Sequence, residues 1–272
     1  MPAARRRSRW QLEVLHAVAE HLNRQVELQP MLEGAVALIL QLLHLQTGWV
    51  VLREDESRLV PAAAWGLPPA LAADDRAALR WTPCRCQRML LAGELLEPVH
   101  IVDCERLERI HQALAGASPA EVAGQTGDLH VHVSVPLRAG DRVLGLLNLA
   151  RAGREPPDRE TVLLLRRVGD TLGVAIERAR LHAQVEAARR EESQAASRLA
   201  QALLGLTSLE EIGAATFAVL REHLQPDALS LLVADPSRSF LELAAGWGWS
   251  EAYVGRLQLP LHPPEGSGPA AG

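Results

Sequence analysis

Apolar residues near the start of the chain recur every three or four positions, which is the spacing of one helical face. Over residues 10–28 this face comprises Leu12, Leu15, Val18, Ala19 and Leu22. Pro30 then opens a second helix that we expect to reach about Leu45, because proline suits a first helical turn. From Gly48 the apolar segments shorten, and GWVVLRED (48–55) and LVPAAAWG (59–66) predict two strands joined by a polar turn.

The middle of the chain is less regular. Residues 67–129 mix short helices with loops rich in proline, glycine, alanine and aspartate. Two firmer strands follow, at 129–138 and 142–151, and the tight turn Ala139-Gly140-Asp141 joins them. Residues 157–205 predict one very long helix.

The second half of that helix has the spacing of a coiled coil. Its apolar positions follow a 4-3 pattern, interrupted once by Glu192, and comprise Leu181, Val185, Ala188, Ala195, Leu199 and Ala202. We expect residues 158–179 to pack on their own domain. For residues 181–202 the pattern favours the seam of a homodimer formed through the 157–205 helix.

An internal repeat links the two ends of the chain. Residues 43–71 and 222–253 share the order His-Leu-Gln, apolar strand, Asp/Ser/Arg turn, apolar strand and Ala-Ala-x-Trp-Gly or a close variant of it. A similar helix precedes each copy, so we expect two copies of one fold, the second of them truncated. Trp65 and Trp247 end the paired strands and are expected to be core side chains.

Composition narrows the class of protein. A net charge of -5 gives no reason to expect nucleic acid or anionic lipid as partner, and none of the 28 basic residues is lysine. The longest apolar run, residues 34–45, is too short to span a membrane, and no secretory signal is present. The basic residues 1–9 are expected to form a disordered tail. The sequence therefore predicts a cytoplasmic protein.

The paired strands VSVPLRAGDRVLGLLNLA (133–150) and the helix AIERARLHAQ (175–184) resemble those of GAF domains. The resemblance implies an α+β fold, with a central antiparallel sheet, helices on both faces and a long signalling helix. It divides the chain into a disordered tail (1–9), a GAF-like sensor domain (10–180), a coiled-coil linker (181–206) and a truncated second GAF-like domain (207–272). Tandem GAF domains are typical of bacterial sensor kinases and related regulators.

GAF domains bind many ligands, so the fold leaves the signal open. The Asn-Lys-x-Asp signature of the cyclic-nucleotide subgroup requires a lysine, and the Asp-Ile-Pro loop of the bilin subgroup is also missing. Cys84, Cys86 and Cys104 are the chain's three cysteines, and their segment resembles one found in a subset of GAF-containing sensor histidine kinases. That resemblance indicates a sensor of oxygen, nitric oxide, redox state or nitrate, as in the control of nitrate respiration by a two-component system.

Thiolates are ligands for soft metals and iron–sulfur clusters. The one-residue spacer between Cys84 and Cys86 suits a cluster better than structural zinc, which favours spacers of two to four residues. We therefore expect an iron–sulfur cluster, with zinc or no centre as alternatives. Since free cysteines are often simply buried, plain core packing and a reversible thiol switch also remain open.

A cluster held by three cysteines needs a fourth ligand, and histidine can serve. In HVHVSVPL, alternation places the valines on one strand face and His130, His132 and Ser134 on the other, toward the expected pocket. His132 is the first choice and His130 the second, with His100 and His111 behind them. Asp103, Arg106 and Arg138 could alternatively bind an anion such as nitrate, because arginine suits planar oxyanions.

The known catalytic motifs are missing, including a phosphate-binding loop with lysine, a nucleophile elbow and His-Glu-x-x-His. We therefore expect a sensory binding module, not an enzyme, whose output is a histidine kinase or transcription regulator. A ligand-free dimerisation scaffold is one alternative. The other is a thiol enzyme of the methionine-sulfoxide-reductase kind, since some GAF-fold enzymes use cysteines in this region.

Overall fold

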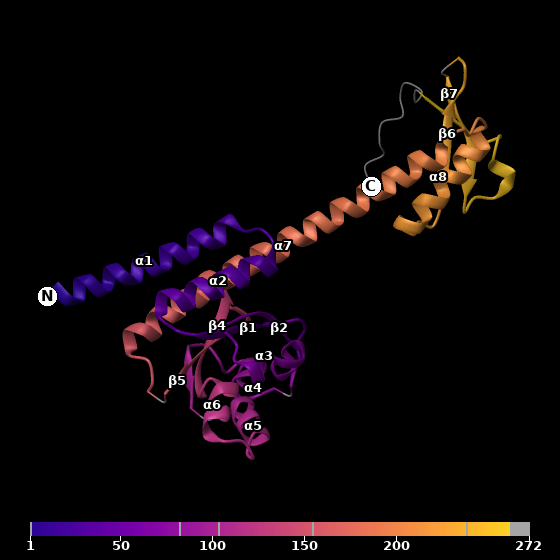
Figure 1. The fold of residues 1–272 in the computed structure, drawn as a ribbon. Coiled ribbons are helices and arrows are strands. Elements are labelled where there is room, and N and C mark those ends of the chain that lie inside the picture. Colours follow the sequence, from indigo (N-terminus) through magenta and orange to yellow (C-terminus); the bar gives the residue numbers. More distant parts are fainter. Residues whose placement is uncertain (1, 82, 103, 154, 238, 262–272) are drawn as a thin grey trace. The chain divides into compact units, whose positions relative to one another are not determined.

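The computed structural model describes residues 2–81, 83–102, 104–153, 155–237 and 239–261 (Figure 1). The chain divides into two compact units, residues 1–184 and residues 185–272, and each has a sheet of its own. Within the described residues, every helix is too short or too polar to cross a membrane. Helices combined with antiparallel sheets confirm the predicted α+β class.

The first unit is built on a five-stranded antiparallel sheet in the order β2-β1-β5-β4-β3. Its strands are β1 (Thr47–Arg53), β2 (Leu59–Trp65), β3 (Val99–Ile101), β4 (Leu129–Ala139) and β5 (Arg142–Ala152). Gly140, with φ +60°, lies in the turn between β4 and β5, where the sequence predicts one. Both predicted strand pairs are therefore present, and β5 joins them by pairing with β1.

Three helices cover one face of this sheet: α1 (Pro2–Arg24), α2 (Leu28–Leu43) and α7 (Arg159–Leu203) (Figure 1). Their apolar stripes meet the inward residues of β1 and β4 in a dry core that includes Val18, Ile39, Val135 and Leu172. Strand alternation sends Val50 to this core and its neighbours to the opposite face.

Helix α7 lies directly against the backbone of β4. A side chain at Gly169 would collide with the carbonyl oxygen of Pro136, and one at Gly173 with that of Arg138. Because the two glycines are four residues apart, they share one face of the helix. They allow the helix to approach the strand more closely than larger residues would.

The opposite face of the sheet is covered by the segment between β2 and β4. It contains α3 (Pro69–Arg76), the 3₁₀ helix η1 (Ala77–Arg80), α4 (Arg85–Leu91), α5 (Glu105–Ala113) and α6 (Pro119–Thr126). A second core lies there, and it brings the three cysteines together with Trp49 of β1 and Leu146 of β5. The predicted pocket face is thus the face that carries the cysteines.

The second unit repeats the helix and hairpin of the first. After α7 come α8 (Leu209–Leu224), β6 (Leu229–Ala234), β7 (Phe240–Trp247), the 3₁₀ helix η2 (Glu251–Tyr253) and β8 (Gln258–Pro260). The strands form a sheet in the order β6-β7-β8, and among the described residues of this unit Phe217 of α8 and Leu243 of β7 are buried large apolar side chains.

The tail predicted to be disordered over residues 1–9 is helical where the structure describes it, because α1 begins at Pro2. Alanine and arginine are strong helix formers, and proline suits the first helical position. Arg7 also forms ion pairs with Asp158 (3.7 Å) and Glu160 (3.3 Å), which hold this end of α1 beside the start of α7. The long helix itself is confirmed, with bounds within two residues of the predicted 157–205.

Candidate thiol and histidine site

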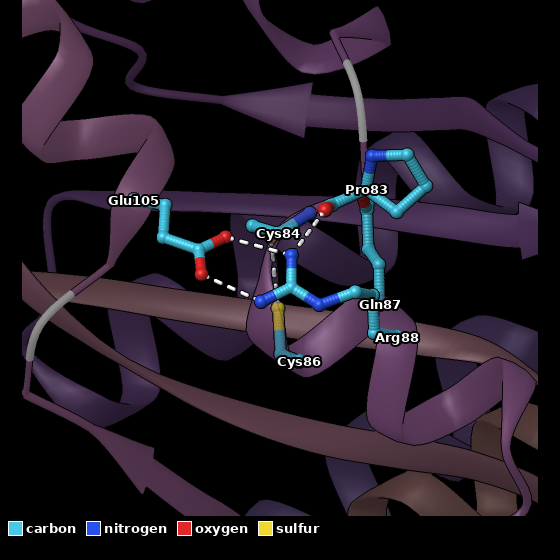
Figure 2. Close-up of polar contacts among 6 residues, drawn as sticks. All are labelled: Pro83, Cys84, Cys86, Gln87, Arg88 and Glu105. Atoms are coloured by element: carbon cyan, nitrogen blue, oxygen red, sulfur yellow. Dashed lines mark hydrogen bonds and ion pairs between the residues drawn. The ribbon is translucent and has the colours of Figure 1, made fainter.

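The three cysteines lie at the beginnings of two short helices. Cys84 immediately precedes α4 and Cys86 lies in the first turn of that helix (Figure 2). Cys104 immediately precedes α5. The backbone N–H of Cys84 donates to Gln87 Oε1 at 3.3 Å, which satisfies a donor that the helix start would leave free. All three side chains are buried, with exposed fractions of 5%, 2% and 2% in chain order.

The sulfur atoms contact one another and the polar face of the sheet. Cys84 Sγ and Cys86 Sγ are 3.3 Å apart, and Cys86 Sγ donates to Asn148 Oδ1 on β5 at 4.0 Å. Asn148 Oδ1 also accepts a hydrogen bond from Ser134 Oγ on β4 at 2.7 Å. A continuous polar network therefore links the helix that carries two cysteines to the two central strands below it.

The three thiols differ in acidity. Hydrogen bonds from the thiols of Cys104 and Cys86, aided by the charge of Arg106, lower the pKa of Cys84 against the opposing effect of burial. The same contacts with Cys84, together with burial, raise the pKa of Cys86 and of Cys104. The arrangement therefore favours one thiolate, at Cys84, that accepts hydrogen bonds from two neutral thiols.

His132 lies on β4 near these sulfurs and is 1% exposed. Both of its ring nitrogens are buried without a hydrogen-bond partner in the described part of the chain, although its ring is 5.5 Å from that of Trp49. Burial lowers the pKa of His132 to about 4, so the imidazole is neutral near pH 7. A neutral imidazole with free nitrogens is in the state that ligates metals.

Arg106, on α5, is also buried, with an exposed fraction of 4%. Its guanidinium donates to the carbonyl of Ala78 and, at 2.9 Å, to Gln87 Oε1, and both acceptors are neutral. A buried cation is costly without a counter-charge. Arg106 also lowers the pKa of Cys84, so the sulfur lies within electrostatic range of the guanidinium and its deprotonation is favoured there.

An ion pair joins α4 to α5 above the sulfurs. Arg88 donates to both carboxylate oxygens of Glu105, at 2.9 and 2.6 Å, and to the carbonyl of Pro83 at 2.7 Å (Figure 2). A cavity of about 430 Å³ lies beside this pair, and Cys84, Arg106 and Arg109 line it together with Trp81. The cluster is therefore buried but borders a cavity.

A family model described as the GAF domain matches residues 25–177, which is more than half of the chain. The chain belongs to the GAF domain family. The described geometry of the first unit, a central sheet with helices on both faces, is the fold that the resemblance implied.

One relative of this GAF domain is a sensor histidine kinase of Bacillus subtilis (strain 168), named YhcY. It is 34% identical over 170 residues, which cover 62% of this chain and 43% of the relative, so the chain spans less than half of that protein. Among solved structures, a GAF domain from a phosphoenolpyruvate-protein phosphotransferase of Coxiella burnetii is 19% identical, with a TM-score of 0.48 and coverage of 64% of this chain and 96% of that one. A corresponding domain from Acinetobacter is 16% identical, with a TM-score of 0.44 and coverage of 63% and 95%.

Four of the five residues that the sequence nominates lie on one face of the sheet: the three cysteines share one core with Trp49, and His132 is near Trp49 and within electrostatic range of Cys84. We call Cys84, Cys86, Cys104 and His132 the thiol–histidine cluster. His130 is not part of it: its side chain is partly exposed, bonds to Asp128 Oδ1 at 3.3 Å and stacks on His111 with ring centroids 4.3 Å apart. The pairing of β4 shifts between Leu129 and Val131, so Leu129 joins the core on the cysteine face and the simple alternation fails.

The remaining candidates have different surroundings. His111 bonds to the carbonyl of Leu129 at 2.9 Å, and His100 lines, with Arg151, a second cavity that His132 also borders. Arg138 lies on β4, where its Nε has no partner in the described part of the chain, and Asp103 lies outside the described residues. Arg106, one of the three residues considered for an anion, lines the same cavity as Cys84.

Sequence reasoning placed Ser134 on the pocket face but missed Asn148 and Gln87, two further polar residues beside the thiols. Asn148 and Ser134 are 1% and 0% exposed and connect the strands to Cys86. The signal for Asn148 was present, since LLNLA places one amide in an otherwise apolar strand, and a buried amide requires partners. Gln87 gave no comparable signal, because its role depends on the packing of α5 against α4.

Proposed function

We propose that this GAF domain is the sensing part of a signalling protein related to the sensor histidine kinases, and that the thiol–histidine cluster is its sensing site. The observation that carries the proposal is the burial of three cysteine thiols and an unpartnered imidazole on one sheet face. Buried polar groups without partners cost free energy, so their retention favours a ligand or a reaction at that position.

The group that best suits this donor set is an iron–sulfur cluster, with zinc as the second choice. Thiolates prefer soft metals, and the neutral His132 offers a fourth ligand of the kind that replaces cysteine in Rieske-type centres. As placed, no set of three or more Cys, His, Asp or Glu side chains among the described residues could hold a metal ion, so binding requires the sulfurs to separate. A bound cluster would supply a centre that responds to redox state, oxygen or nitric oxide.

Reversible thiol oxidation is the second candidate, and the 3.3 Å sulfur separation favours it. A thiolate at Cys84 with two neighbouring thiols is the arrangement from which disulfides form. The same chemistry would serve a thiol enzyme of the methionine-sulfoxide-reductase kind. The two candidates differ in iron content, which makes them separable by analysis.

Side-chain contacts connect the cluster to α7. The carbonyl of Leu91, at the end of α4, accepts a hydrogen bond from Arg53 Nη2 at 3.4 Å. The carbonyl of Arg53 in turn accepts one from Arg180 Nη2, on α7, at 2.9 Å. Movement of α4, which carries Cys84 and Cys86 at its other end, would therefore change the contacts of the output helix.

We expect the output of this sensor to be a histidine kinase, in line with the kinase relative, or a transcription regulator, and we expect it in the cytoplasm. We expect a homodimer through α7, because Leu181 and Val185 are 57% and 50% exposed along its predicted seam. The signal would be a small molecule or gas: oxygen, nitric oxide, nitrate or a change of redox state. Such a sensor needs two arrangements of α7, one for each output state. The signal changes the output only if the protein binds the signal with different affinity in these two arrangements.

Anaerobic purification tests the proposal. We expect a coloured protein with iron and sulfide, and we expect Cys84→Ser and His132→Ala to lose iron and visible absorbance. His130→Ala is the matched control, since His130 lies two residues away on the same strand but outside the cluster. Its iron content should equal that of the unchanged protein.

The opposite results identify the alternatives. If the protein is colourless and free of iron, and an oxidant produces a disulfide at Cys84, the site is a thiol switch and not an iron–sulfur centre. Normal signalling by an iron-free protein and by its Cys84→Ser variant would instead support a ligand-free dimerisation scaffold. Turnover of methionine sulfoxide by the purified chain would identify an enzyme.

A further inference from the structure

The cavity beside Cys84 has an unusual charge for a protein whose net charge is -5. Arg88, Arg106, Arg109 and Glu105 are its charged lining residues. Glu105 is occupied by Arg88, which binds both of its oxygens. The two remaining guanidinium groups have no carboxylate partner in the described part of the chain, so the cavity is locally positive.

Apart from the Cys84 sulfur near Arg106, the described contacts of these two arginines are with neutral groups. Among the described residues, the buried Arg106 donates to a carbonyl and an amide oxygen. The guanidinium carbon of Arg109 lies 5.3 Å from the ring centroid of Trp81, and an aromatic ring holds a cation without cancelling its charge. A concave site with excess charge of one sign concentrates ligands of the opposite sign.

One thiol of the cluster lines this cavity. Cys84 is among its lining residues, whereas Cys86 and Cys104 are not. A volume of about 430 Å³ lies within the range of small-molecule pockets and exceeds what a single inorganic ion requires. The cavity thus offers one sulfur to an organic anion.

We propose that this cavity admits anionic low-molecular-weight disulfides, which modify Cys84. The Cys84 sulfur attacks one sulfur of the disulfide, the bond between the two disulfide sulfurs breaks, and the other half leaves as a thiolate. A mixed disulfide at Cys84 is formed, and the disulfide reagent is the oxidant. Arg106 and Arg109 attract the reagent and stabilise the negative charge that leaves.

The inference rests on the proposed function in one respect, because it makes the anionic disulfide a signal for the thiol–histidine cluster. Modification would remove Cys84 as an acceptor for the neighbouring thiols and separate α4 from α5. It would also compete with metal for the same sulfur. The modification itself needs only the cavity, so it can be tested on iron-free protein.

Three disulfides of similar size and different charge provide the test: dithiodipropionate (anionic), hydroxyethyl disulfide (neutral) and cystamine (cationic). Reduced, iron-free chain is exposed to each, and mass spectrometry of the intact protein and its peptides follows the adduct. We expect the anionic reagent to modify Cys84 about tenfold faster than the cationic one, although the net charge of the protein favours the reverse order. The difference should shrink as salt is added.

Single substitutions locate the selectivity. Arg109→Gln should reduce the anionic preference several-fold, while Arg80→Gln, at an arginine outside the cavity that pairs with Asp75, should leave it unchanged. Cys84→Ser should abolish the adduct. Equal or faster reaction of cystamine, or first modification at Cys86 or Cys104, would overturn the inference.

Separate readouts distinguish this inference from the proposed function. Selective modification of an iron-free chain whose adduct leaves the signalling output unchanged supports the cavity but contradicts the sensing role of the cluster. A chain that binds iron and signals, yet shows no charge preference at Cys84, contradicts the cavity and leaves the sensing role intact.

Discussion

The two hairpins of the repeat, β1–β2 and β6–β7, have the same internal geometry in different surroundings. Trp65 pairs with Gly48 in the first and Trp247 with Leu229 in the second, and each register shifts two pairs further on, between Val50 and Val51 and between Leu231 and Leu232. A glycine with positive φ follows each tryptophan. The repeated sequence therefore specifies the hairpin down to its bulge.

The turns of the two hairpins also agree. Asp55 accepts hydrogen bonds from the backbone of Ser57 and Arg58, and Asp235 accepts them from the backbone of Ser237, Ser239 and Phe240. Hydrogen bonds from Ser57 lower the pKa of Asp55, and those from Phe240 and Ser237 lower that of Asp235. Local side-chain contacts of this kind depend on sequence alone, so they recur in both copies.

The two hairpins differ in how deeply their first strand is buried. β1 lies between β2 and β5 and is buried along nearly its whole length, whereas β6 pairs only with β7 among the described strands and is half-buried. Ser230 occupies the position of Trp49, which contacts His132 in the first unit. Both units therefore share the hairpin, whereas the candidate site depends on the further strands and helices that surround the hairpin in the first unit.

The largest expected change in the free energy of unfolding comes from substitutions at equivalent positions of β1 and β6. Leu52→Ala should lower the free energy of unfolding by about 2–5 kcal/mol, because Leu52 is 2% exposed in the dry core. Val233→Ala, at the matching position of β6, should cost about 1 kcal/mol because Val233 is only half-buried. Urea titrations followed by circular dichroism measure both, and equal losses would contradict the difference in burial.

The second prediction uses the buried imidazole of His132, whose ring lies 5.5 Å from that of Trp49 in the first hairpin. The pKa of His132 is about 4 when folded and about 6.5 when unfolded, so the unfolded chain binds more protons between these values. Stability should be fully present above pH 6.5 and fall by up to about 3 kcal/mol as the pH drops to 4. His132→Gln should remove this part of the pH dependence in urea titrations, and His130→Gln should retain it. A flat profile for the unchanged protein would show that His132 is not buried as a neutral group.

The smallest predicted loss of stability concerns the glycine that follows each hairpin tryptophan, and it should be equal in the two hairpins. In Gly66→Ala the new side chain would collide with the carbonyl oxygen of Gln46, and in Gly248→Ala with that of Asp227, while both residues keep a positive φ. Each substitution should cost about 1–3 kcal/mol of unfolding free energy. Thermal unfolding measures the pair, and a loss in only one copy would mean that the two turns are not equivalent.

Periodicity correctly predicts those parts of the fold that do not depend on contacts between elements distant in the sequence. The repeat, the paired strands and the long helix follow from local spacing, and all three are present. Trp65 shows the limit of this reasoning: it was predicted to be core but is 55% exposed, because nothing in the described chain covers the end of β2. Trp247, at the same position of β7, is half-buried and lies under Arg221, 4.2 Å from its ring centroid.

The candidate site was predictable in part. Cys84 and Cys86 are close in sequence, but their approach to Cys104 depends on how α4 packs against α5, which no local pattern encodes. Alternation correctly placed His132 and Ser134 on the cysteine face, and it failed at His130 because of the shift at the start of β4. Arg106 was considered only as an anion ligand, since burial of an arginine beside a thiolate is a property of the folded chain.

The close contact of α7 with β4 has a mechanical consequence. Gly169 and Gly173 place the helix against the backbone of the strand whose other face carries His132 and Ser134. At these two positions the helix has no side chain of its own to change rotamer, so helix and strand backbone lie in direct contact. The cluster and α7 are thus separated at this point by the thickness of one strand, so a shift of the β4 backbone would displace the helix directly.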